Sequence, residues 1–145
     1  MQTEYIKITD PLLQEDDLAR AASILKNGGL VVFPTETVYG LAADALNEQA
    51  VASIFRAKGR PADNPLIVHI SEVEEIYPLV TSFPDKAKAL VEAFWPGPLT
   101  IILPKSDIVP KEVCPRLETV AVRMPSHPVA RAIIKAAGVP LAAPS

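Results

Sequence analysis

Apolar and polar positions divide this chain into short strands and amphipathic helices. Six segments are wholly apolar or alternate between apolar and polar residues, which predicts strands at 5–8, 30–33, 66–70, 99–103, 119–124 and 140–143. The segment 5–8 alternates weakly and is expected at a sheet edge. The segment 30–33 is apolar throughout and is expected to be buried on both faces.

Apolar residues at helical spacing predict helices between these strands, over 10–27 or 15–27, 48–57, a short segment after Ser71, 84–94 and 126–137. Asn47 is expected to cap the second helix. Ser71 with Glu74 forms a capping-box pattern for the third, and Ser126 is expected to cap the last. Helices that alternate with short strands indicate an α/β domain with a central sheet.

Composition narrows the possible classes of protein. The chain has 145 residues, 49% apolar and 21% charged, which is typical of one globular domain. Its net charge of −3 gives no overall basic field that would attract nucleic acid. The single cysteine, Cys114, excludes an internal disulfide and fits a cytoplasmic protein, and the two histidines form no zinc motif. No apolar run approaches the roughly 18 residues of a membrane span, so no membrane partner is expected.

Several familiar catalytic motifs are missing from the sequence. It contains no Gly-x-Gly-x-x-Gly fingerprint, no glycine-rich loop ending in Gly-Lys-Ser/Thr, and no Gly-x-Ser-x-Gly elbow. Cys114 has no histidine near it in sequence, so it is expected to be a small structural residue and not a nucleophile.

Polar residues at the ends of strands are the remaining candidates for a site. Thr35 and Thr37 follow the first apolar strand, His69 closes the second, Arg123 lies near the end of the alternating strand, and Ser145 follows the last. Ligands of open α/β sheets bind beyond the carboxyl ends of the strands, so these side chains predict a polar pocket for a small anion. Each also has an ordinary interpretation: turn-forming threonines with a solvated glutamate between them, a core histidine, and an arginine that reaches the surface.

Two cations stand two residues apart in Lys58-Gly59-Arg60-Pro61. Residues i and i+2 of an extended segment point the same way, so Lys58 and Arg60 would aim at one target if this piece is extended. An ammonium beside a guanidinium suits phosphate or carboxylate oxygens. The alternative interpretation is a solvated basic loop.

Five motifs, in order and over nearly the whole chain, resemble the YrdC-type threonylcarbamoyl-adenylate synthases. They are Pro34-Thr35-Glu36-Thr37-Val38-Tyr39-Gly40-Leu41, Lys58-Gly59-Arg60-Pro61, Asn64-Pro65-Leu66, Trp95-Pro96-Gly97-Pro98-Leu99-Thr100 and Val122-Arg123-Met124-Pro125. The final Ala142-Ala143-Pro144-Ser145 matches the start of that family's Ser-x-Asn motif. The resemblance implies a YrdC-like twisted mixed sheet with flanking helices and a concave polar pocket. Because the Asn of the last motif is absent, we expect residues 1–145 to be a YrdC-like domain truncated at its C-terminus.

The resemblance also implies an activity. Members of this family are nucleotidyltransferases that join L-threonine, bicarbonate and ATP into threonylcarbamoyl-AMP and release pyrophosphate, with Mg²⁺ accompanying ATP. The product supplies the threonylcarbamoyl group of a modified adenosine in tRNA, so tRNA or a downstream transferase is an expected partner. An alternative without catalysis is a tRNA-binding module. A second is the carbamoyl-transfer domain of a hydrogenase-maturation protein, although such proteins carry zinc-finger-like cysteines that this chain lacks.

Carried over position by position, the resemblance assigns roles to nine residues. Those expected to bind ATP are Lys58, Arg60, Asn64 and Thr119, and the first two are also the expected catalytic cations. Those expected to bind threonine are Thr35, Thr37, His69, Arg123 and Ser145, with Arg123 facing the carboxylate.

Overall fold

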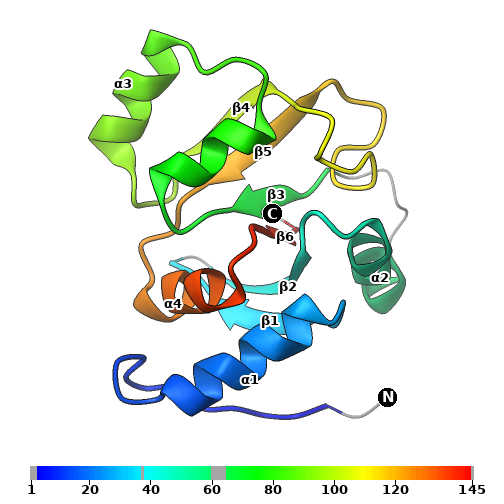
Figure 1. Ribbon diagram of the computed structural model, residues 1–145, viewed down its shortest axis with the longest axis vertical. Coiled ribbons are helices and arrows are strands. Elements are labelled where there is room, and N and C mark those ends of the chain that lie inside the picture. Colours follow the sequence, from blue (N-terminus) through cyan, green and yellow to red (C-terminus); the bar gives the residue numbers. More distant parts are fainter. Residues whose placement is uncertain (1–2, 37, 60–64, 145) are drawn as a thin grey trace.

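The computed structural model describes residues 3–36, 38–59 and 65–144, which form one mixed sheet with helices on both faces (Figure 1). The helices are α1 (Glu15–Lys26), α2 (Glu48–Lys58), the 3₁₀ helix η1 (Val73–Leu79), α3 (Asp85–Phe94) and α4 (Pro128–Ala137). The strands are β1 (Val31–Pro34), β2 (Tyr39–Asp44), β3 (Ile67–His69), β4 (Thr100–Pro104), β5 (Thr119–Arg123) and β6 (Leu141–Ala143). The predicted α/β class with a twisted mixed sheet and flanking helices is confirmed.

The order of strands across the sheet is β1-β2-β6-β3-β5-β4. Strands β3 and β5 are parallel, and every other neighbouring pair is antiparallel. The last strand, β6, therefore lies in the middle of the sheet, with β2 on one side and β3 on the other. It therefore has hydrogen-bonded partners along both of its edges.

Each face of the sheet has its own hydrophobic core. On one face, α2, α3 and η1 pack against residues such as Val68, Val120 and Val122. On the other face, α1 and α4 pack against Phe33, Leu141 and their neighbours from β1, β2 and β6. Helices α1 and α4 cover only the half of this face that β1, β2 and β6 form. Strand residues alternate between faces, so the uncovered part, called here the open face, carries the side chains of Thr100, Ile102, Ile67, Ala121 and Thr119.

Two strand predictions are wrong, and one strand was missed. Residues 5–8 form no strand: Tyr5 is almost fully exposed, and the Gln14 side chain holds this segment by donating to the Lys7 carbonyl. Strand β1 is not buried on both faces, because it is an edge strand paired only with β2, and Val32 is 60% exposed. Strand β2 was not predicted, since its Tyr-Gly-Leu-Ala-Ala-Asp sequence has little intrinsic strand preference and depends on pairing with β1 and β6.

The helices were predicted more accurately than their caps. Asn47 caps α2, with its side chain accepting from Gln49 N and Ala50 N. The predicted capping box of Ser71 with Glu74 is wrong, because Ser71 bonds to Glu75 through both its backbone N–H and its hydroxyl. Ser126 does not cap α4.

His127 is the N-cap of α4, and its ring nitrogen accepts from Val129 N. On α3, Ala87 and Val91 are buried, whereas the apolar residues Leu90 and Phe94 are exposed. Among the described residues, none of the helices combines the length and apolar character that crossing a membrane requires.

Candidate functional site

The ends of the parallel strands β3 and β5 place His69 and Arg123 side by side. The two residues are partners in the strand register, so their side chains lie on the same face of the sheet. Both are buried, with 3% and 7% of their surface exposed. The ordinary interpretation of Arg123 as a side chain that reaches the surface is therefore wrong. The interpretation of His69 as a buried histidine with a satisfied ring nitrogen agrees with its surroundings.

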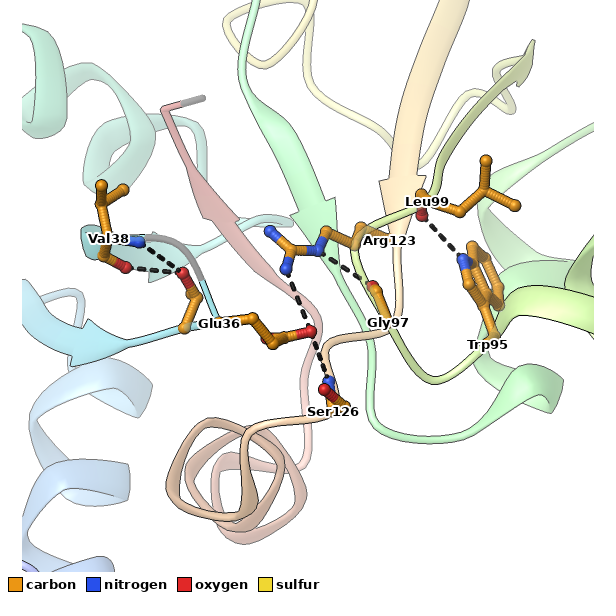
Figure 2. A network of polar contacts seen from close by, with 8 residues as sticks. Glu36, Val38, Trp95, Gly97, Leu99, Arg123 and Ser126 are labelled. Carbon is orange, nitrogen blue, oxygen red and sulfur yellow. Dashed lines mark hydrogen bonds and ion pairs between the residues drawn. The ribbon is translucent and has the colours of Figure 1, made fainter.

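Two protein groups hold the Arg123 guanidinium (Figure 2). Its Nε–H donates to the Gly97 carbonyl at 3.1 Å, and its Nη2 lies 3.1 Å from the Glu36 carboxylate. The second contact is an ion pair whose geometry does not make a hydrogen bond, so the buried Nη2 lacks a hydrogen-bond acceptor among the described residues. The guanidinium thus keeps N–H donors that no described residue accepts from, and a buried donor of this kind favours a ligand oxygen.

Glu36 links two distant parts of the chain. Its Oε2 accepts from the backbone N–H of Ser126, ninety positions further along, and pairs with Arg123. Burial alone would raise the pKa of the Glu36 carboxyl, but hydrogen bonds from Ser126 and from its own backbone, with the Arg123 charge, lower that pKa to about 2. The carboxylate therefore stays ionised at neutral pH and offsets the buried cation. The interpretation of this glutamate as merely solvated is wrong.

His69 is held neutral in a mostly apolar pocket. Its Nδ1 lies 3.0 Å from the Ile67 carbonyl, and the Phe33 ring meets its ring edge-on at a centroid distance of 5.6 Å. Burial, reinforced by the nearby Arg123 cation, lowers the pKa of His69 to about 4, although the hydrogen bond to Ile67 acts in the opposite direction. Because a carbonyl only accepts, the contact with Ile67 assigns the proton of the neutral ring to Nδ1.

The segment 95–99 forms a wall beside Arg123. The Trp95 indole N–H donates to the Leu99 carbonyl at 2.8 Å, which closes this segment on itself, as Figure 2 shows. The Gly97 N–H donates to the Met124 carbonyl, and the Gly97 carbonyl faces Arg123. A Cβ at Gly97 would lie 2.8 Å from the Phe94 carbonyl oxygen, so only glycine fits this path without a shift.

Three other candidates lie within the described residues. Thr35 forms the turn between β1 and β2, where its hydroxyl donates to the Val38 carbonyl and accepts from the Val38 N–H. Thr119 begins β5 on the same face as Arg123, four residues away, which corresponds to about 13 Å of extended strand. Lys58 is the exposed last residue of α2, followed by Gly59 in the left-handed region, so the extended conformation considered for this segment does not hold at Lys58.

Four predicted site residues, Thr37, Arg60, Asn64 and Ser145, lie outside the described residues. The roles assigned to all nine candidates stay predictions.

The described candidates do not all follow the same end of the strands. Strand β1 runs opposite to β3, because three antiparallel pairings separate them, so Thr35 follows the edge opposite to the one where His69 and Arg123 lie. The turn after β1 nevertheless brings Glu36 to Arg123 across the face of the sheet (Figure 2). Glu36 and Arg123 are therefore joined by this contact although they follow opposite ends of the strands.

Sequence reasoning missed two groups that shape this site, Glu36 and the Gly97 carbonyl. Both lie within the motifs quoted above, but their contacts join segments far apart in sequence. The only available signal was a charged residue between two threonines beside an apolar strand. Within residues 3–36, 38–59 and 65–144, no three His, Cys, Asp or Glu side chains group as possible metal ligands.

Comparison with known proteins identifies relatives of this chain. A threonylcarbamoyl-AMP synthase from Bacillus subtilis is 52% identical over 143 residues, covering 97% of this chain and 41% of that protein. One from Pyrococcus abyssi is 53% identical over 133 residues, covering 92% of this chain and 39% of that protein. The crystal structure of P. abyssi Sua5 complexed with L-threonine superposes with a TM-score of 0.89 at 53% identity, over 91% of this chain and 39% of that one.

This chain thus spans about two fifths of the length of these relatives. Residues 23–145 match the Sua5/YciO/YrdC family, whose description reads "Telomere recombination". With the match covering most of the sequence, and with relatives above 50% identity, the chain belongs to the Sua5/YciO/YrdC family.

Proposed function

We propose that this chain provides the L-threonylcarbamoyladenylate synthase site of its protein. The reaction joins L-threonine, bicarbonate and ATP to give threonylcarbamoyl-AMP, pyrophosphate and water. Two relatives above 50% identity carry the name of this enzyme, and a related structure holds L-threonine, which supports the proposal. The product would supply the threonylcarbamoyl group for modification of an adenosine in tRNA.

The observation that carries the proposal is the buried Arg123 guanidinium with an unsatisfied donor. A guanidinium that keeps N–H groups for a ligand is suited to a carboxylate, which accepts two parallel hydrogen bonds. In this proposal Arg123 binds the threonine carboxylate, and neutral His69 beside it contacts the same ligand. Thr35, Thr37 and Ser145 complete the threonine end of the site.

ATP would occupy the other part of the open face. Thr119 lies on this face, away from Arg123, with the half-buried side chains of Ile67 and Ala121 between them. This arrangement supports a nucleotide placed beside the amino acid along the strand direction. Lys58, Arg60 and Asn64 would hold the phosphates, because Lys58 ends α2 and the segment after it leads into β3.

The chemistry needs positioning more than it needs a protein nucleophile. The threonine amine, once deprotonated, attacks the bicarbonate carbon, and water leaves to give a carbamate. A carbamate oxygen then attacks the α-phosphorus of ATP, and pyrophosphate leaves. Each step brings anions together, so cations and fixed dipoles in a water-poor site supply the rate. Arg123, Lys58 and Arg60 are the cations available for this task.

Mg²⁺ is proposed to enter with ATP. This ion prefers oxygen ligands and commonly binds substrate phosphates while keeping several waters. Hydroxyls and cations around the nucleotide are compatible with an ion held in that way.

The proposed partners are ATP, L-threonine and bicarbonate. We propose that tRNA or a downstream transferase acts after release of the product, and that the reaction takes place in the cytoplasm.

The tRNA-binding alternative is less well supported. The net charge of −3 opposes the sequence-independent attraction on which such binding depends. The carbamoyl-transfer alternative is less well supported by the identities, since relatives above 50% identity are synthases.

Calorimetric titration tests the proposal. ATP with Mg²⁺ is titrated into the chain in the absence and presence of L-threonine, with L-serine as the control. We expect ATP to bind more tightly when L-threonine is present and to be unaffected by L-serine. A folded chain that binds neither ATP nor L-threonine would contradict the proposal.

A further inference from the structure

The orientation of Arg123 depends on two groups from different parts of the chain. The Gly97 carbonyl takes the Nε–H at 3.1 Å, and the Glu36 carboxylate lies 3.1 Å from Nη2. The Gly97 carbonyl is a fixed backbone group, because its segment is closed by the Trp95 hydrogen bond and has no room for a Cβ at position 97. The Glu36 carboxylate belongs to a side chain, so a substitution can change it without changing the backbone.

Glu36 is itself fixed before any ligand arrives. The backbone N–H of Ser126 donates to Glu36 Oε2 over 2.9 Å, and this is the same oxygen that faces Arg123. The turn that carries Glu36 is closed by the hydrogen bonds between Thr35 and Val38. The carboxylate therefore has a defined place, with its position set by β1 on one side and by the connection from β5 to α4 on the other (Figure 2).

The contact between Glu36 and Arg123 leaves donors available. Arginine has five N–H donors, and only Nε–H is taken by a protein acceptor among the described residues. The terminal nitrogen without a dashed line in Figure 2 points toward the side of the view where Val38 lies, away from Gly97. Glu36 thus neutralises the buried charge of Arg123 without accepting a hydrogen bond from it, and the remaining N–H donors of Arg123 can bind a ligand.

We propose that Glu36 is a positioning residue, which holds the Arg123 guanidinium so that its remaining N–H donors face the carboxylate of an amino-acid ligand. The identity of that ligand, L-threonine, rests on the proposed function. Glu36 is unsuited to proton transfer, because a carboxyl with a pKa of about 2 is too weak a base to deprotonate an ammonium group. Its contribution is to fix the orientation of Arg123 and to balance its charge.

Glu36→Gln removes the charge and keeps an amide oxygen that can still accept from Ser126 N–H, so the turn retains its tether. Hydrogen exchange of the Arg123 Nε–H, measured by NMR and assigned by its loss in Arg123→Lys, reports the orientation directly. We expect exchange about tenfold faster in Glu36→Gln, since a free guanidinium leaves the Gly97 carbonyl more often. Glu74→Gln, at an exposed glutamate with no contact to the site, should match the wild type. An unchanged exchange rate in Glu36→Gln would overturn the proposal.

Ligand binding gives the second measurement. We expect the Kd for L-threonine to rise about tenfold or more in Glu36→Gln, while the Kd for ATP with Mg²⁺ stays unchanged. Equal binding of L-threonine by the variant would show that Glu36 contributes nothing to this site, and tighter binding would show that it competes with the ligand; either result contradicts positioning. If the wild type itself binds no L-threonine, the proposed function fails, and the exchange rate still decides whether Glu36 positions Arg123.

Discussion

Acidification should destabilise this protein through His69. The residue is buried, and the pKa of its ring is lowered from 6.5 to about 4, because the charged form is poorly solvated and lies near the Arg123 cation. The unfolded chain therefore binds a proton at His69 at a pH where the folded chain does not. Stability is fully present above pH 6.5 and is lost progressively as the pH falls toward 4.

The two pKa values set the size of this loss. Linkage of one proton between pKa values of 6.5 and about 4 removes about 2 kcal/mol of unfolding free energy between pH 7 and pH 5. By pH 4 the loss from this residue reaches about 3 kcal/mol. That is a large share of the 5–15 kcal/mol, roughly, that stabilises a typical domain.

Urea unfolding measured at pH 7, 6, 5 and 4 tests this prediction. His69→Gln has no titrating ring, so its unfolding free energy should fall less than that of the wild type, and the difference between the two curves isolates the contribution of His69. His127→Gln, at the other histidine, keeps His69, so the part of the loss assigned to His69 should remain in this variant. If wild type and His69→Gln lose equal stability between pH 7 and pH 5, the assignment of a buried neutral His69 is wrong.

Four further substitutions test other parts of the account. Gly97→Ala places a Cβ 2.8 Å from the Phe94 carbonyl oxygen, so we expect a loss of about 2 kcal/mol in urea unfolding together with weaker L-threonine binding. Gly138→Ala, whose strain lies at the end of α4, should cost stability and leave L-threonine binding unchanged. Asn47→Ala should cost about 1 kcal/mol, because α2 loses its cap, and thermal unfolding measures this. Arg60→Ala should remove most pyrophosphate release while circular dichroism shows a folded chain, and retained release would refute its role.

The local elements were predictable, whereas the order of strands was not. Asn47 and the apolar stripe after it define α2 from its own sequence, and the wholly apolar run ending at His69 defines β3. Strand β6 lies between β2 and β3 in the sheet. In the sequence, more than twenty residues separate β2 from β3, and far more separate either strand from β6. Local patterns carry no information about such pairings, which depend on how helices cover the finished sheet.

The same distinction applies to the candidate site. His69 and Arg123 each stood out at the end of a strand, and the parallel pairing of β3 with β5 makes them neighbours. Glu36 could not be recognised from sequence, because its partners Arg123 and Ser126 lie about ninety residues away. Its neighbouring threonine, Thr35, was correctly interpreted as a turn former by the ordinary alternative.

The most direct test of the central claim is to identify the product of the proposed reaction by mass spectrometry. The chain is incubated with L-threonine, ATP, Mg²⁺ and ¹³C-bicarbonate, and Arg123→Met serves as the control. The account predicts a threonine–carbonyl–AMP adduct that contains the ¹³C label and is missing in the control. Formation of the labelled adduct by Arg123→Met at the wild-type rate, or its absence from a wild-type chain that binds both ATP and L-threonine, would contradict the account.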